Sequence, residues 1–304
     1  MLKNRADDSE GSDDSAPAPE IGQEGASTVR RILLGALLRR LRESRGISMQ
    51  LAGYHIRATE SKISRMETGK VSFKERDVAD LLTFYGVTDS AEHAQVMALV
   101  REANAPGWWH SFSEVLPPWF QAYVGLESAA AVVRTYEIQF IPGLLQCPEY
   151  VRAVVSADRA ATPSELDRRI ELRLRRQLAL ERGDGPRLWV VLDEAAVRRP
   201  VGGREVMEAQ IRYLIDQACS PNVTIQLLPY RVGAHAAEGG AFTVLRFAEA
   251  DLPDIVYIEQ LARAQFIEKP DIVERYAAAM EQITVEALTP EQTVTVLESM
   301  VKAG

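Results

Sequence analysis

The chain has 304 residues, of which 46% are hydrophobic, and its 43 Asp and Glu against 35 Lys and Arg give a net charge of −8. This length and apolar content are enough to bury a large core and predict two folded domains. No stretch reaches the roughly 18 consecutive apolar residues that a membrane helix needs, and the N-terminus lacks the basic start and apolar core of a signal peptide. We therefore expect a cytoplasmic protein without a membrane partner.

Residues 1–27 are predicted to form a disordered acidic tail. They are polar and contain few large apolar side chains, so they cannot bury enough surface to offset the entropy lost on ordering. An Ala-Pro-Ala-Pro stretch at 16–19 follows a group of acidic residues, namely Asp7, Asp8, Glu10, Asp13 and Asp14.

Residues 28–105 carry the pattern of a small helical domain. A first helix, which ends at Gly46, has an apolar stripe at helical spacing. The stripe consists of Leu34, Leu37, Leu38 and Leu41. Ser48 is a suitable N-cap for a short second helix. Two further amphipathic segments, at 78–85 and 96–100, complete a predicted all-α domain of five helices.

The third helix of this domain has the composition of a helix that reads DNA. Thr59 is placed to cap it and Gly69 to close it, while Ile63 and Met66 share an inward face. The outward face carries Ser61, Ser64, Arg65 and Thr68. Short polar side chains allow close approach to the major groove, and Arg can donate two hydrogen bonds to guanine.

The charge of this segment also favours DNA as a partner. Residues 30–76 contain twelve Lys or Arg and four Glu, a net charge of +8 on a chain that is acidic overall. A basic module of this kind is expected where phosphates are neutralised and counterions released. A helical bundle with a merely basic surface is the structural alternative.

The segments Leu-Arg-Arg-Leu-Arg-Glu-Ser-Arg-Gly-Ile-Ser at 38–48 and Ser-Lys-Ile-Ser-Arg-Met-Glu-Thr-Gly-Lys at 61–70 resemble the phage-repressor-like (XRE) helix-turn-helix of actinobacterial regulators. The resemblance implies that Glu60, Ser61 and Arg65 contact base edges of double-stranded operator DNA. It also implies contacts with the phosphate backbone from Thr59, Lys62, Ser64, Thr68 and Lys70. A structural ion pair between Arg42 and Glu67 is implied as well.

Two residues depart from the pattern of that family. Met49 stands where a Gln usually binds phosphate, and Arg57 stands in a turn where Gly is usual. Arg57 is tolerated if the turn avoids positive φ, or it contacts DNA itself.

Residues 106–304 are predicted to form an α/β or α+β domain around one mixed sheet. Runs suited to strands alternate with helical patterns, and their order in the sheet does not follow from the sequence. The predicted strands are 131–136, 188–192, 223–228, 242–247 and 255–258.

This region resembles the C-terminal domain of a large group of actinobacterial regulators. The matching segments are 125–127, 134–137, 141–146, 173–177, 192–195, 200–203 and 228–230. Members are described as antitoxin-like transcriptional regulators of Scr1-type systems, commonly encoded beside a gene for a very small protein. The resemblance implies a sequence-specific regulator whose C-terminal domain senses that small protein. Paired half-sites are usual for such heads, which favours a homodimer.

Two alternatives concern the C-terminal domain. Its aromatic residues, including Trp108, Trp109 and Trp119, would line a small-molecule effector pocket or belong to the core. Hydrolytic activity would require acid and base groups. The candidates are Glu127, Glu137, Glu171, Arg173, Arg176, Asp193, Glu194 and His235. Asp193 also suits a helix N-cap, and Cys147 and Cys219 lack metal-ligand spacing, so we expect no enzyme, no catalytic residue, no metal and no cofactor.

Overall fold

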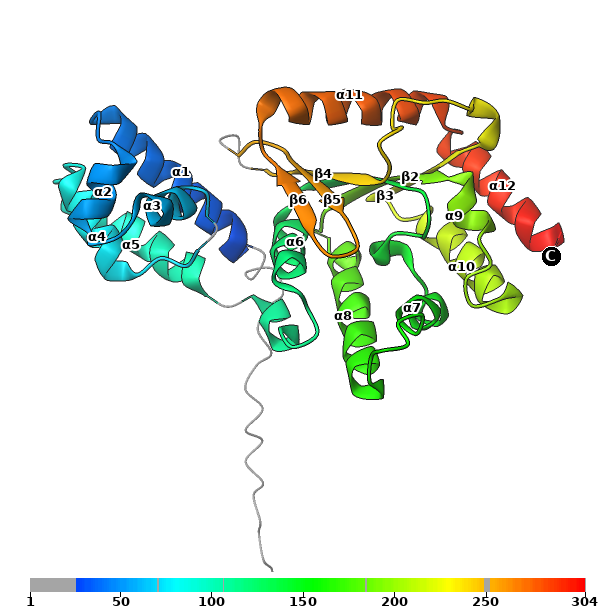
Figure 1. Ribbon diagram of the computed structural model, residues 1–304. Helices are drawn as coiled ribbons and strands as arrows, with labels where there is room; N and C mark the ends of the chain where they lie inside the picture. Colours follow the sequence, from blue (N-terminus) through cyan, green and yellow to red (C-terminus); the bar gives the residue numbers. More distant parts are fainter. Residues whose placement is uncertain (1–25, 70, 106, 184, 249–251, 304) are drawn as a thin grey trace, which may run out of the picture.

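The computed structural model describes residues 26–69, 71–105, 107–183, 185–248 and 252–303. The N-terminal domain is all-α, as predicted, and lies at one end of the molecule (Figure 1). Its five helices are α1 (Ala26–Ser44), α2 (Met49–His55), α3 (Glu60–Glu67), α4 (Glu75–Phe84) and α5 (Ser90–Asn104). Helix α1 begins two residues before the expected boundary at residue 28. The rest of the expected acidic tail lies outside the described residues.

The ends of α2 and α3 are fixed by the residues that the sequence indicates. Ser48 Oγ accepts a hydrogen bond from the Leu51 amide at 3.1 Å, and Thr59 Oγ1 accepts one from the Lys62 amide at 3.3 Å. Each cap satisfies an amide that the helix leaves unpaired, which contributes about 1 kcal/mol. After α3 the chain turns at Gly69, whose φ is 66°.

Close packing of α1 against α3 depends on Gly35. A Cβ at this position would lie 2.5 Å from the Met66 carbonyl oxygen and 2.7 Å from that of Glu67. The two helices therefore approach more closely than any side chain at this position permits. Around the crossing, the predicted inward residues Leu34, Leu38, Ile63 and Met66 are buried in one core.

The C-terminal domain contains one six-stranded mixed sheet in the order β3-β2-β1-β4-β5-β6. The first three strands are parallel, and the last three continue the sheet in antiparallel fashion. The strands are β1 (Val132–Glu137), β2 (Arg187–Asp193), β3 (Val223–Leu228), β4 (Phe242–Arg246), β5 (Ile255–Glu259) and β6 (Ala264–Ile267). Five of them were predicted, and the sequence pattern missed β6.

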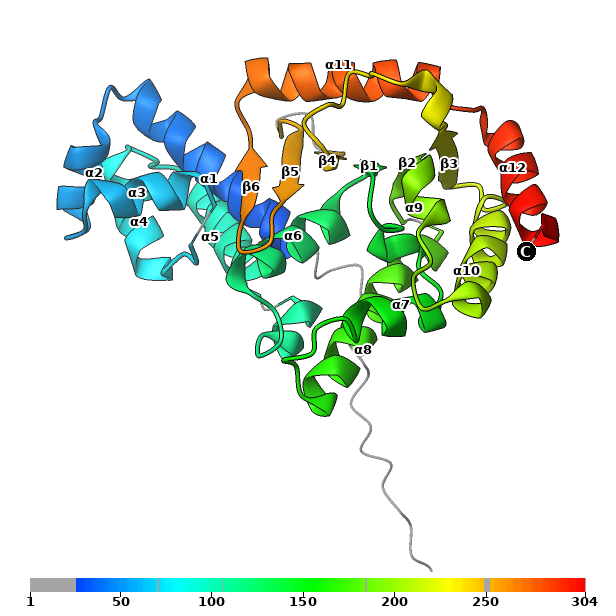
Figure 2. The ribbon, with the colours of Figure 1, turned by 45° about the vertical axis from the view of Figure 1, so that its right-hand side comes forward.

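Helices cover both faces of the sheet (Figures 1 and 2). The α helices are α6 (Pro118–Ala129), α7 (Pro148–Val155), α8 (Pro163–Glu181), α9 (Glu194–Arg198), α10 (Arg204–Gln217), α11 (Pro270–Glu286) and α12 (Pro290–Ala303). Three short 3-10 helices join them: η1 (Trp108–Phe112), η2 (Gly143–Leu145) and η3 (Tyr230–Val232).

The two sides of the sheet form separate cores because side chains alternate along each strand. On β2, Val190 and Leu192 pack with α6, α8 and α10, whereas Val191 packs under α11. The domain is thus three layers, helix on sheet on helix. Within the described residues, no helix combines the length and apolar character needed to cross a membrane.

Helix α1 belongs to both domains. Its central residues lie in the helix-turn-helix core, but Ile32 and Leu33 pack against the core of the C-terminal domain. Helix α1 contacts α6 there, and the two lie side by side in Figure 2. The same helix therefore contacts both α3 and the C-terminal sheet domain.

Candidate functional site

The outward face of α3 is exposed, as its pattern predicts. The residues expected to contact bases, Glu60, Ser61 and Arg65, are all exposed, while Ile63 and Met66 are each 1% exposed. The Arg65 guanidinium donates from Nε to the Ser61 carbonyl oxygen at 3.3 Å and has no carboxylate partner among the described residues. It is therefore available to a ligand at this face.

The residues expected to contact phosphates differ in what they already contact. Thr59 caps α3, and the Thr68 hydroxyl donates to the Ser64 carbonyl oxygen at 2.9 Å, while Ser64 is exposed. Lys62 is half-buried and its ammonium forms an ion pair with Asp77 of α4. A phosphate contact from Lys62 thus has to compete with this pair. Lys70 lies outside the described residues.

The predicted ion pair between Arg42 and Glu67 is present and joins α1 to the end of α3. Arg42 Nε donates to Glu67 Oε1 at 2.6 Å and Nη2 to Oε2 at 2.9 Å, with both side chains below a tenth exposed. Arg42 Nη1 also donates to the Ile47 carbonyl oxygen at 2.8 Å. The hydrogen bond to Glu67 outweighs burial and raises the pKa of Arg42. Removing one partner of such a buried pair costs roughly 3–5 kcal/mol.

The turn between α2 and α3 has a left-handed backbone conformation, which Gly adopts more easily than other residues. Arg57 has φ 55° and is exposed. Of the two alternatives for Arg57, a turn that avoids positive φ is therefore ruled out, and a contact between Arg57 and DNA stays a prediction. This conformation is strained for a residue with a Cβ by about 1–2 kcal/mol.

In the C-terminal domain, two of the candidate acid and base groups meet through a buried tyrosine. Tyr136 Oη lies 3.4 Å from Asp193 Oδ2 and 3.2 Å from His235 Nε2, at the carboxyl ends of β1 and β2. Burial, followed by the charge of Asp193, raises the pKa of Tyr136. These contacts of Tyr136 could not be predicted from the sequence, because Tyr136 resembles any apolar residue of a strand.

The acid and base candidates near Tyr136 already accept hydrogen bonds from backbone amides. Asp193 Oδ1 accepts from the Ala195 amide at 2.8 Å, which confirms its predicted role as an N-cap. Glu194 accepts from the Tyr230 amide at 2.9 Å and from Arg198 Nε at 2.6 Å. His235 Nδ1 accepts from the Ala237 amide at 3.2 Å.

The remaining candidates lie on the opposite face of the sheet. Arg176 and Glu127 form a buried bidentate pair at 2.8 and 2.7 Å. Arg173 donates to Gln146 Oε1 at 2.9 Å, and burial lowers its pKa to about 10. Burial raises the pKa of Glu137 to about 8, with a smaller opposing effect from its Thr135 hydrogen bond. Glu171 is exposed and pairs with Arg168 at 2.7 Å.

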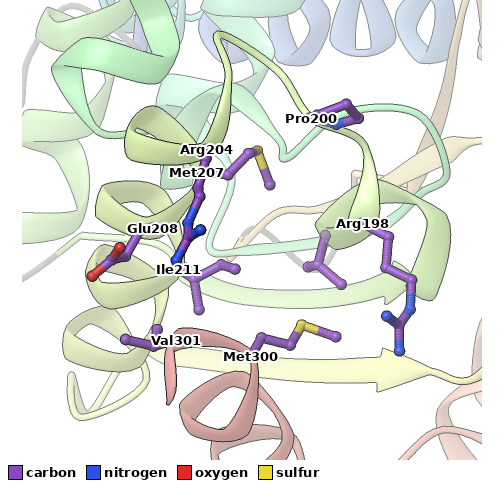
Figure 3. Close-up of a pocket in the computed structure, with 9 residues that line it drawn as sticks. Arg198, Pro200, Arg204, Met207, Glu208, Ile211, Met300 and Val301 are labelled. Atoms are coloured by element: carbon purple, nitrogen blue, oxygen red, sulfur yellow. The ribbon is translucent and has the colours of Figure 1, made fainter. Parts of the chain in front are cut away.

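An open pocket of about 210 Å³ lies between α9, α10 and α12. Figure 3 shows Met207 and Ile211 of α10 and Met300 of α12 lining it, with Arg198 and Arg204 at its sides. The aromatic residues proposed as pocket lining are elsewhere: Trp108 and Trp109 are buried in a separate core cluster, and Trp119 packs against the main one. No group of His, Cys, Asp and Glu in the described part of the chain is arranged to hold a metal ion.

Two family models match the chain. The model described as a helix-turn-helix domain matches residues 33–95, and the model described as a domain of unknown function, DUF5753, matches residues 120–299. Comparison with curated proteins and with solved structures gave no match. The first match supports DNA-binding regulation as the role of the N-terminal domain.

Proposed function

This chain belongs to the DUF5753 family, and we propose that it is a sequence-specific, antitoxin-like transcriptional regulator whose C-terminal domain senses a small protein partner. The observation that carries the proposal is the exposed polar face of α3, which presents Ser61, Ser64 and Arg65. The ion pair between Arg42 and Glu67 fixes the end of this helix to α1. Such a face fits the major groove, where Arg distinguishes guanine from the other bases.

The operator would contain two related half-sites bound by a homodimer. One short recognition helix contacts few base pairs, so paired heads supply the affinity and specificity that a single head lacks. A partner could then control DNA binding by changing the distance between the two helix-turn-helix domains of the dimer.

Helix α1 supports coupling between the two domains. Because Ile32 and Leu33 pack against the C-terminal core and Arg42 binds Glu67, a shift of α6 is transmitted to α3 through one helix. A partner that binds one arrangement of α6 more tightly than another would favour that arrangement by the difference between the two affinities. It would thereby change the fraction of molecules that can bind DNA.

We favour binding over catalysis for the C-terminal domain. Asp193, Glu194 and His235, the residues suited to acid and base roles, each bond to the backbone at positions that build the fold. The second candidate function is regulation by a small effector, which the pocket beside Arg204 favours. Its volume of about 210 Å³ is below the roughly 300–1,000 Å³ of common ligand sites, so this pocket suits only a small effector.

Fluorescence anisotropy of the full chain tests the proposal. It compares the duplex upstream of the chain's own gene with a scrambled duplex, with and without the small protein encoded next to it. We expect a preference of at least roughly a few hundredfold for the upstream duplex, and we expect the small protein to change it. A preference that the small protein does not change would support a DNA-binding regulator but refute sensing of that partner. Equal binding of both duplexes would refute specific recognition.

A further inference from the structure

We propose that the acidic N-terminal segment, residues 1–25, docks on the basic surface of the helix-turn-helix domain and competes there with DNA. The proposal deepens the DNA-binding function proposed above and rests on it for its consequence, but not for the docking itself. Three features of the chain support it: the unpaired cations of the domain, the charge of the segment, and the position at which the segment joins α1.

The basic surface consists of exposed cations that have no carboxylate partner among the described residues. These are Arg40, Arg45, Arg57, Arg65 and Lys74. Arg39 and Lys62 of the same domain are already neutralised, in the pairs Arg39–Glu43 and Lys62–Asp77. The uncompensated charge is therefore concentrated on a few residues, two of which, Arg57 and Arg65, lie just before α3 and within it.

The segment carries the opposite charge in matching amount. Residues 1–25 contain seven Asp or Glu against Lys3 and Arg5, a net charge of −5. At physiological salt, charges interact over about 8 Å, so attraction requires the segment to reach the surface rather than to act from a distance.

The chain is long enough to reach it. The backbone of Gly69, at the end of α3, lies against that of Ile32, since a Cβ on Gly69 would be 2.9 Å from Ile32 Cα. Ile32 is only about 9 Å along α1 from Ala26, at 1.5 Å per residue. Twelve residues separate Asp14 from α1, and a chain of that length can reach at most roughly 40 Å. Tethering at this range gives an effective concentration in the millimolar range.

Docking would lower affinity for every duplex by the same factor, since the segment must leave before any DNA binds. Random DNA is held by phosphates alone, typically with Kd near 10⁻⁴–10⁻⁶ M, so the same factor removes most non-specific binding and leaves operator binding effective. The segment would thus act as an internal substitute for DNA phosphates.

The first experiment measures the binding of full-length chains to a random duplex. In the test variant all seven acidic residues of the segment are replaced by their amides, from Asp7→Asn to Glu24→Gln, and a control chain carries the same 25 residues in shuffled order. We expect the amide variant to bind about tenfold more tightly than wild type at low salt, the factor for a surface occupied nine-tenths of the time. The difference should vanish at high salt, and the shuffled chain should behave as wild type.

A second experiment detects docking without DNA. A nitroxide on Ser9→Cys, in a Cys219→Ser background, should broaden the amide signals of Ser61 and Arg65 at low salt but not at high salt. Absence of this broadening would overturn the proposal, as would equal affinities of the amide variant and wild type for the random duplex. If broadening occurs in a chain that binds no DNA at all, the docking stands and the proposed function fails.

Discussion

At the scale of single residues, side chains near α3 differ in what binding DNA would require of them. Arg65 contacts only a backbone carbonyl, whereas Lys62 is paired with Asp77 and the Thr59 hydroxyl is engaged as a cap. A residue with no carboxylate partner gains most from a new ligand, because no existing ion pair has to be broken. Arg65 is therefore the strongest candidate for reading a base.

Replacing Arg65 with Ala should lower operator affinity by about 1–3 kcal/mol and affinity for random DNA much less, because a bidentate contact with guanine is lost. Anisotropy titrations with both duplexes measure the difference. Arg159→Ala removes an exposed charge from the C-terminal domain and serves as the matched control. Equal losses on both duplexes for Arg65→Ala would mean that Arg65 contacts phosphate only.

Asp77→Asn tests whether Lys62 contacts phosphate. Loss of the carboxylate frees the Lys62 ammonium, so we expect tighter binding of operator and random DNA alike, with a salt dependence steeper by up to about one phosphate contact. Thermal unfolding of the same variant reports the stability lost with the pair. Unchanged affinity and slope would assign Lys62 a purely structural role.

Glu137 should make the stability of the C-terminal domain fall as pH rises. Its pKa is raised from 4.5 to about 8 in the folded chain, so between these values the folded state holds a proton that the unfolded state has lost. The unfolding free energy therefore declines across this window. Glu137→Gln should flatten the dependence of Tm on pH from about 5 to 8.5. An unchanged slope would show that Glu137 is ionised in the fold.

Among the helices and strands, features that depend on neighbouring residues could be predicted from the sequence, whereas the pairing of distant strands could not. Ser48, Thr59 and Asp193 were placed as caps because capping depends on a few neighbouring residues. The strand order places β4 beside β1, which the sequence does not encode locally. Strand β6 has only four residues and too little alternation to be recognised.

The candidate site likewise combines a feature that could be predicted from neighbouring residues with contacts between distant residues that could not. The exposed face of α3 was predictable from its period of 3.6 residues. The partner of Lys62 and the contacts of Tyr136 were not, since Asp77 lies on another helix and His235 lies almost a hundred residues further along the chain.

Gly35→Ala tests whether close packing of α1 on α3 is needed. Alanine favours a helix by up to about 1 kcal/mol, yet its Cβ would meet backbone oxygens of α3, so we expect a net loss of about 1–3 kcal/mol in the free energy of unfolding. Denaturant unfolding measures it, with Ala36→Ser on the exposed side of α1 as control. A stabilised variant would contradict the close approach.

In the whole molecule, α1 is the connection through which the proposed regulation would pass. Its first turns pack with the sheet domain and its later turns with the recognition helix. A rigid helix shared by two domains transmits displacement, whereas a flexible linker would not.

Ile32→Ala with Leu33→Ala should weaken that connection while leaving both domains folded, because these side chains are only partly buried. We expect operator binding to persist but to lose its response to the small partner. Anisotropy titrations with and without the partner measure this. A full response in the double variant would place the coupling elsewhere.

Selection of bound duplexes from a random-sequence pool measures whether α3 reads base edges. The full chain should enrich one site with two related halves, and Arg65→Ala should enrich the same site with a single position relaxed in each half. Enrichment of an identical site by both chains would show that Arg65 reads no base, and enrichment of no site by the full chain would show that α3 does not read base edges.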